Sequence, residues 1–338
     1  MRKRMVLIVL ALMLVATAGV VAYDSVDEVV DFPDAKLEAV IRFEIQKPAG
    51  DIHQSDLEEL TGIFDMWSIG GEIHSLYGLE NCINLKHLYL LGNSIDDISP
   101  LAGLTKLTAL DLPMNEITDI SPLAQLTGLE RLVISANRIS DLEPLANLTS
   151  LTMLNAVQND VRDISPLADL SGLTELRLGG NRIADISPLA GLTNLTSLDL
   201  SKNLITDLSP IRNLANPIDI HLGGNRIANA EPLSSLSGLR LLYLDENQIS
   251  DITPLSKLAN LAELRLDDNQ VSDMSPLLQT CGLRGVDSVQ LGSGTLRFGG
   301  GNGLWIRNNP LSTVSIDEHI PQLEEMGIRV IWQEKNEE

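Results

Sequence analysis

The sequence predicts an α/β solenoid, a stack of short repeats, and two observations carry that prediction. An asparagine returns every 22 residues within a constant frame of leucine and isoleucine, as in NEITDISPLAQLTGLERLVISAN, which starts at Asn115. Aromatic residues make up only 3% of the chain. A period in the twenties with this pattern is typical of a solenoid, whose units bury their apolar faces against one another because each is too small to form a core. The asparagines of the series are Asn93, Asn115, Asn137, Asn159, Asn181, Asn203, Asn225, Asn247 and Asn269.

Residues 1–22 have the pattern of a signal peptide. The basic start MRKR precedes an apolar run from Met5 to Ala22, and Val20 and Ala22 are small residues suited to cleavage. An uncleaved membrane anchor is the alternative, because a run of 18 residues reaches the lower limit for spanning a bilayer. Either way we expect the repeats to leave the cytoplasm, as a secreted or cell-surface protein.

Residues 23–62 predict a helical cap that covers the first repeat. Apolar side chains at Leu37, Val40, Ile41 and Ile45 form a helical stripe after the start signal Pro33-Asp34. A second, shorter helix is expected from Ser55. An exposed terminal repeat would leave its core in water, so a solenoid needs such a lid.

Residues 63–282 form the repeats, beginning with a degenerate one in which Gly71 replaces the asparagine. Leu110 and Leu112 point to one side of a short strand, so Asp111 between them points to the opposite, concave side. The strands of successive repeats pair in parallel. Each asparagine offers donors and acceptors to the turn, which predicts a structural ladder. Ser121-Pro122 predicts a helix start with the serine hydroxyl as its cap, and Asp119 can accept from nearby amides.

The repeat register breaks after residue 282. Residues 283–303 alternate like two strands separated by glycine turns, which predicts an inserted β-hairpin. Residues 304–338 then predict a carboxy-terminal cap with a strand, an asparagine turn at Asn309, a helix from about Ser315 and a closing strand.

The 22-residue unit NxIxDIxPLxxLTxL resembles the internalin-type class of bacterial leucine-rich repeat proteins. The segments FPDxxLEAxIR and NNPLS…IPQLEEMGIRV are similar to the caps of exported bacterial repeat proteins. The resemblance implies a curved right-handed leucine-rich repeat superhelix, a parallel β-sheet on its concave face, and a role in binding or adhesion. No cell-wall anchoring signal follows the cap, and the hairpin is an addition, so adhesion to host cells is unsupported.

An enzyme is excluded by spacing. His87 and His221 both face the concave side about six repeats apart, roughly 29 Å at strand spacing, whereas a nucleophile and its base must come within about 3 Å. Phosphate loops, HExxH and CxxC motifs are absent from the sequence. We therefore expect no catalytic residues, no cofactor and no metal centre. Cys82 and Cys281 are roughly 40 Å apart, too far for a disulfide; Cys82 is expected to be buried and Cys281 exposed.

The formal net charge of −22 disfavours nucleic acid and anionic lipid as partners. It favours a basic protein partner, a cation, or simply solubility. Membrane contact is expected only through the amino-terminal segment, if that segment is uncleaved.

Variation within the constant frame predicts two zones on the concave face. Toward the amino end, we expect a group of solvent-exposed apolar side chains, which suggests an interface. Toward the carboxy end, Asp219, Asp245, Glu263 and Asp267 flank His221, Tyr243 and Arg265. Asp245 and Asp267 are expected about 5 Å apart, where a partner's basic side chain, a cation, or Arg265 with solvent would balance them.

These patterns favour an exported, monomeric, non-catalytic protein that binds another protein or a surface ligand through its concave face. A structural, self-assembling component of the cell surface would use the same frame and is the alternative. The predicted binding residues are Tyr89, Leu91, Pro113, Val133, Met153, Val157, Arg177, Asp199, His221, Tyr243, Asp245, Arg265 and Asp267.

Overall fold

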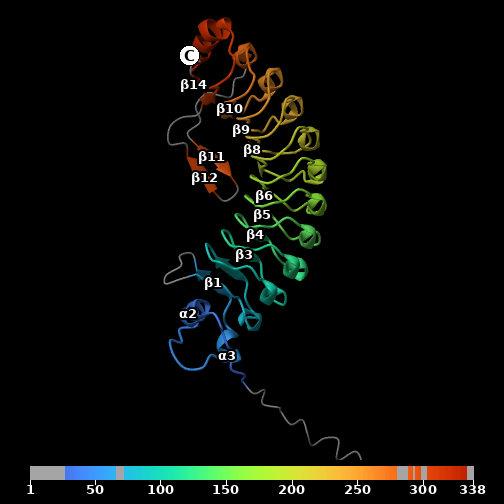
Figure 1. Cartoon of the computed structure of the whole chain (residues 1–338). Helices are drawn as coiled ribbons and strands as arrows, with labels where there is room; N and C mark the ends of the chain where they lie inside the picture. The colour runs from blue at the N-terminus through green and yellow to red at the C-terminus, as the bar shows by residue number, and fades with distance from the viewer. Residues whose placement is uncertain (1–26, 66–71, 280–287, 292–293, 298–302, 333–338) are drawn as a thin grey trace, which may run out of the picture.

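The computed structural model describes residues 27–65, 72–279, 288–291, 294–297 and 303–332. The predicted signal segment, Gly71 and Cys281 lie outside these residues. Figure 1 shows an arc whose inner side is lined by strands and whose outer side carries short helical turns. The predicted leucine-rich repeat solenoid is confirmed.

In the described residues, twelve parallel strands form one sheet in chain order, interrupted only by a hairpin. Equivalent positions of successive repeats stand opposite one another, so Leu110 pairs with Leu132 and Asp111 with Val133. The strands are β1 (Gly62–Asp65), β2 (His87–Leu90), β3 (Ala109–Asp111), β4 (Arg131–Val133), β5 (Met153–Asn155), β6 (Glu175–Arg177), β7 (Ser197–Asp199), β8 (Asp219–His221), β9 (Leu241–Tyr243), β10 (Glu263–Arg265), β13 (Gly303–Trp305) and β14 (Arg329–Ile331).

The repeating asparagines form a buried ladder between adjacent repeats. The Asn137 Oδ1 accepts from the Ile117 amide at 3.0 Å, while its Nδ2 donates to the carbonyls of Leu112 at 3.0 Å and Ile134 at 3.1 Å. One amide therefore satisfies buried backbone groups in two consecutive repeats, where no strand neighbour is available. The ladder is part of the frame.

The convex turns are short 3₁₀ helices, and their capping differs from the prediction. The Asp119 carboxylate accepts from both the amide and the hydroxyl of Ser121, at 2.7 and 2.9 Å. The predicted serine cap is thus wrong: the hydroxyl donates to the aspartate, which itself caps the turn. The turns are η1 (Leu79–Asn81), η2 (Ser99–Leu101), η3 (Ser121–Gln125), η4 (Glu143–Leu145), η5 (Ser165–Leu167), η6 (Ser187–Gly191), η7 (Ser209–Ile211), η8 (Glu231–Ser235), η9 (Thr253–Lys257) and η10 (Ser275–Gln279).

A column of left-handed residues runs beside the ladder, one position before each asparagine. Three of its members are glycines, but Ala136 at φ 53° and Lys202 at φ 52° adopt the same backbone. Bulkier side chains pay a steric cost in this region, so the turn geometry of the repeat overrides residue preference. The column comprises Gly92, Met114, Ala136, Gln158, Gly180, Lys202, Gly224, Glu246, Asp268 and Asn308.

The amino-terminal cap consists of α2 (Ala35–Glu44) and the short α3 (Gln54–Leu57). The Asp34 carboxylate caps α2 by accepting from the amides of Lys36 and Leu37. Leu37 and Ile41 are fully buried and continue the core of the repeats. Cys82 is buried in the same core, as predicted, and burial raises the pKa of its thiol to about 12.

At the other end, β10 pairs directly with β13, as Leu264 stands opposite Leu304. The antiparallel hairpin β11 (Ser288–Leu291) and β12 (Gly294–Arg297) is therefore looped out of the stack, and it lies on the concave side in Figure 1. Asn309 continues the ladder across this insertion by accepting from the Val271 amide at 2.9 Å. A π-helical turn η11 (Ser315–His319), α4 (Ile320–Glu325) and β14 close the fold.

Candidate functional site

The concave face presents one central column of side chains, one from each strand of the sheet except the closing strand β14. The strand register places Phe64, Tyr89, Asp111, Val133, Asn155, Arg177, Asp199, His221, Tyr243, Arg265 and Trp305 in this column. Phe64 and Trp305, at its two ends, were missed by sequence reasoning. Both lie where the 22-residue motif is broken, in the degenerate first repeat and beyond the hairpin.

The amino-end apolar surface differs from the prediction. Val133 is only 6% exposed, whereas Tyr89, Leu91, Pro113, Met153 and Val157 are half-buried. Arg131 lies across this zone: its guanidinium binds the Asp111 carboxylate at 3.0 Å and lies 3.6 Å from the Met153 sulfur. A charged side chain therefore lies among the predicted apolar residues, and Val133 is not exposed as expected.

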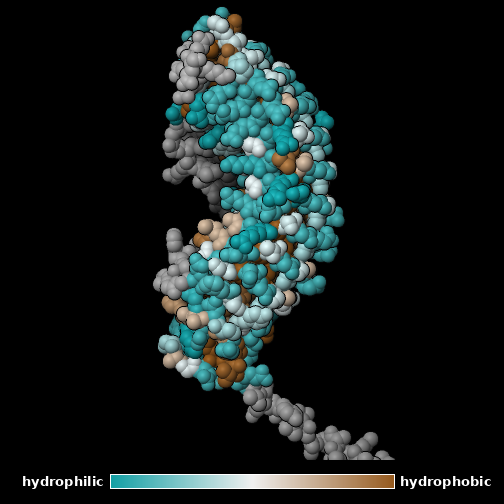
Figure 2. Space-filling model, viewed as in Figure 1, coloured by the Kyte–Doolittle hydropathy of each residue, from teal (hydrophilic) through white to brown (hydrophobic). Residues whose placement is uncertain are grey.

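An aromatic cluster lies at the very start of the sheet. The Phe64 ring is 49% exposed, meets the Tyr89 ring edge-on at 5.2 Å, and stacks on His87 at 6.4 Å between ring centroids. We call Phe64, His87 and Tyr89 the amino-end cluster. Figure 2 shows hydrophobic residues gathered toward the amino-terminal part of the molecule, whereas the carboxy-terminal half of that view is mostly hydrophilic.

A second cluster, His221, Tyr243, Arg265 and Trp305, stands near the other end of the column; we call it the carboxy-end cluster. The His221 and Tyr243 rings lie 4.1 Å apart. The Arg265 guanidinium lies between two rings, 4.8 Å from that of Tyr243 and 5.0 Å from that of Trp305. Burial and the neighbouring Glu263 carboxylate raise the pKa of Tyr243, so its phenol stays neutral at physiological pH.

Three of the four acidic residues of this zone, Asp219, Glu263 and Asp267, are paired internally. Arg265 binds the buried Glu263 at 3.0 Å, and the His221 Nε2 lies 2.8 Å from the Asp219 carboxylate, an ion pair when the histidine is protonated. Asp267 accepts from the Arg307 amide at 2.6 Å and from its guanidinium at 3.1 Å. The idea that Arg265, a cation or a partner balances Asp267 is thus wrong: Arg307 does so, from beyond the hairpin.

Asp245 remains without an ion-pair partner among the described residues, and it lines a hollow of about 320 Å³ on the concave face. Its carboxylate rests against Gly223, where an added Cβ would come within 2.8 Å of it. The hollow therefore depends on the absence of a side chain at this position. Its lining residues are Ser201, Lys202, His221, Gly223, Gly224, Tyr243, Asp245, Glu246 and Arg265.

The middle of the column is polar and also held by neighbours. The Arg177 guanidinium pairs with Glu175 at 2.7 Å. The Asp199 carboxylate accepts from the amide and hydroxyl of Ser201, at 2.9 and 2.6 Å. Within the described ranges, no group of three or more His, Cys, Asp or Glu side chains lies close enough to hold a metal ion.

The repeat and the curved parallel sheet are shared with known proteins. A family model described as leucine-rich repeats matches residues 105–147, 149–191, 171–213 and 237–279. The crystal structure of the internalin InlF from Listeria monocytogenes is 31% identical in sequence, with a TM-score of 0.58, and the match covers 90% of this chain and 96% of InlF. The chain belongs to the internalin family of leucine-rich repeat proteins. A comparison with curated proteins finds no match.

Two further solved structures from the same organism are similar to this internalin-family chain. Internalin C2 from L. monocytogenes is 34% identical over 62% of this chain and 94% of its own, with a TM-score of 0.59. The functional domain of InlJ from L. monocytogenes, which includes a cysteine ladder, has a TM-score of 0.67 at 22% identity, and the match covers 91% of this chain and 62% of that domain. At this identity the likeness shows a shared fold. Leucine-rich repeat proteins of this kind typically bind proteins and are not catalysts. None of the helices in the described part of the chain is long and apolar enough to cross a membrane.

Proposed function

We propose that this internalin-family protein is exported and binds a protein ligand, without catalysis, through the central column of its concave face. The amino-end and carboxy-end clusters support the proposal. Both contain tyrosine with arginine, histidine, phenylalanine or tryptophan, and interface energy concentrates in a few tyrosine, tryptophan and arginine anchors. Residues 1–22 support export, since they have the charge and hydropathy of a signal peptide.

The observation that carries the proposal is the way neighbours hold these anchors in place. Arg265 is fixed by Glu263 and by two aromatic rings, and Arg177 by Glu175. A side chain that is ordered before binding loses less conformational entropy on binding. The anchors are therefore prepared to contact a partner while the core behind the sheet stays unchanged.

The test begins with capture of a partner by purified residues 23–338 from envelope fractions of the source organism. Tyr89→Ala, Arg177→Ala and Tyr243→Ala are each expected to weaken the affinity severalfold or more, because truncation of an anchor costs about 2 kcal/mol. Thr105→Ala and Thr193→Ala, exposed on the convex side, serve as controls and should be silent. Losses that map instead to the convex turns would disprove the concave-face proposal.

A further inference from the structure

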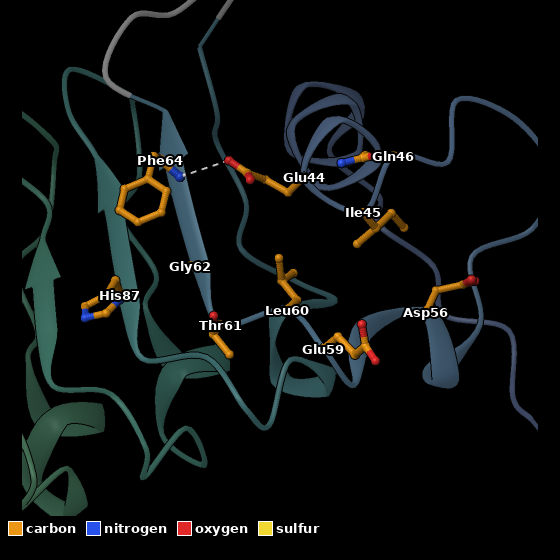
Figure 3. A pocket seen from close by; sticks show the side chains of 10 residues that line it. All are labelled: Glu44, Ile45, Gln46, Asp56, Glu59, Leu60, Thr61, Gly62, Phe64 and His87. Atoms are coloured by element: carbon orange, nitrogen blue, oxygen red, sulfur yellow. Dashed lines mark hydrogen bonds between the residues drawn. The ribbon is translucent and has the colours of Figure 1, made fainter.

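A pocket of about 520 Å³ opens between the amino-terminal cap and the first strand of the sheet. This volume falls in the range of ligand sites, roughly 300–1,000 Å³. Figure 3 shows its side chains coming from the end of α2, from the segment after α3, and from β1 and β2. The lining residues are Glu44, Ile45, Gln46, Asp56, Glu59, Leu60, Thr61, Gly62, Phe64 and His87.

The Phe64 ring forms one wall of this pocket and is held there by its surroundings. It folds back over Gly62, where an added Cβ would lie 2.5 Å from the ring. Tyr89 and His87 contact it from the neighbouring strand. An aromatic ring that is half-exposed and fixed in this way offers a rigid surface to a ligand.

The electrostatic field in the pocket favours a cation. Within the described residues, the Glu44 carboxylate accepts one long hydrogen bond, from the Phe64 amide at 3.4 Å, and Glu59 has no ion pair. The carboxyl end of α2, which carries a partial negative charge, lies at the same place.

Two basic side chains near this end of α2, those of Lys47 and Arg42, are engaged by other groups. Lys47 binds Asp56 at 2.6 Å, and Arg42 binds Glu38 at 2.7 Å as well as the carbonyls of Lys47 and Gly50. Neither of them neutralises Glu44 or Glu59. The pocket therefore combines an aromatic wall with two carboxylates, Glu44 and Glu59, that have no ion pair among the described residues.

We infer that this pocket receives a lysine or arginine side chain from a basic segment of the protein partner. The charged group lies over the Phe64 ring, as in cation–π contacts, and pairs with Glu44, while Glu59, across Leu60 from Phe64 in Figure 3, adds attraction at longer range. The methylene stem packs on Leu60 and Ile45, since long basic side chains bury their stems on apolar surface. An apolar side chain would desolvate the carboxylates without pairing them. The inference rests on the proposed function, because it names the chemistry of the partner at one end of the column.

The test uses a fluorescein-labelled, acetylated Gly-Arg-Arg-Gly peptide and its glutamate counterpart, measured by fluorescence anisotropy at about 0.15 M salt, where distant charges are screened. The whole chain should bind the arginine peptide and not the glutamate peptide. Phe64→Leu, which keeps an apolar wall but removes the aromatic face, and the double variant Glu44→Gln/Glu59→Gln should each weaken binding at least threefold. Thermal melts confirm that both variants are folded.

The matched control is Glu143→Gln/Glu231→Gln, which removes the same charge from exposed positions on the convex turns. It should leave the affinity unchanged. Equal losses in the pocket and control pairs, or no loss in Phe64→Leu, would overturn the inference. If the captured partner still requires Tyr243 in that case, only the pocket assignment fails. If the peptide binds through the pocket but alanine substitution of Tyr89, Arg177 or Tyr243 leaves the partner's affinity unchanged, the concave-face proposal fails instead.

Discussion

At the scale of single residues, the asparagine ladder joins neighbouring repeats. The Asn159 Oδ1 accepts from the Ile139 amide at 2.9 Å, and its Nδ2 donates to the Ile134 carbonyl at 2.9 Å. Asn159→Ala would leave both buried groups unsatisfied, so we expect the free energy of unfolding to fall by about 1–3 kcal/mol. Urea unfolding measures this, with Thr193→Ala as the silent control. If stability were unchanged and partner binding lost, Asn159 would belong to the site and not to the frame.

The left-handed column stores a small strain that glycine should release. Ala136 has φ 53°, whereas Ala146 ends its turn at φ −55°. Ala136→Gly is expected to raise the free energy of unfolding by about 0.5–1 kcal/mol, because glycine adopts positive φ without a steric cost. Ala146→Gly, the same chemical change at an ordinary backbone angle, should lower it by a similar amount. Urea unfolding measures the free energy of unfolding of both variants. If both substitutions lower it, no strain is stored at Ala136.

The ladder was predictable from the sequence because one residue type marks it in every repeat. The left-handed column was not, since methionine, alanine, glutamine, lysine and acidic residues alternate there with glycine. Gly92, Gly180 and Gly224, three glycines in phase with the repeat, were the available signal. The geometry of the turn determines the positive φ at this position, and residue type alone does not reveal it.

At the scale of elements, the aspartates that cap the 3₁₀ turns link stability to pH. Hydrogen bonds from the Ser209 hydroxyl and amide hold the pKa of Asp207 below its ordinary value of 3.8, and Thr253 does the same for Asp251. Because the folded-state pKa is lowered, this stabilisation is complete above about pH 4 and is lost as pH falls through the folded-state pKa. The melting temperature should therefore decline below pH 4.

Replacing the caps with asparagine isolates this effect. Asn229 already caps its turn by accepting from the Glu231 amide at 2.9 Å, so Asp207→Asn/Asp251→Asn keeps the hydrogen bond from the backbone amide and removes the titrating groups. Its melting temperature should fall less between pH 5 and pH 3 than that of the unmodified protein. An identical fall would mean that these carboxylates do not contribute to acid sensitivity.

Repeats, caps and hairpin could be read from periodicity, but the ends of the site could not. Phe64 lies in β1, before the motif becomes regular, and Trp305 lies in β13, after the hairpin has broken the register. Arg307 reaches Asp267 across 40 residues of sequence, a contact that no local pattern indicates. The sequence therefore predicted that the tyrosines and arginines of the regular repeats lie on the concave strands, but it gave no sign that Arg307 pairs with Asp267.

At the scale of the whole molecule, both ends of the sheet are covered by caps, which supports a monomer. Open strand edges promote pairing between chains, and here α2 packs near β1 while α4 packs near β14. Light scattering on residues 23–338 should give one mass that does not change with concentration. Oligomers of defined size that grow with concentration would favour the self-assembling alternative.

The central claim is that the concave column contacts the partner, and hydroxyl-radical footprinting of the captured complex tests it most directly. Tyr89, Met153 and Tyr243 lie on the concave face, whereas Met114 and Tyr77, both more than half exposed, lie outside the column. The account predicts that the partner slows oxidation of Tyr89, Met153 and Tyr243 and leaves Met114 and Tyr77 unchanged. Protection of Met114 and Tyr77, with Tyr89, Met153 and Tyr243 oxidised as fast as in the free protein, would contradict it.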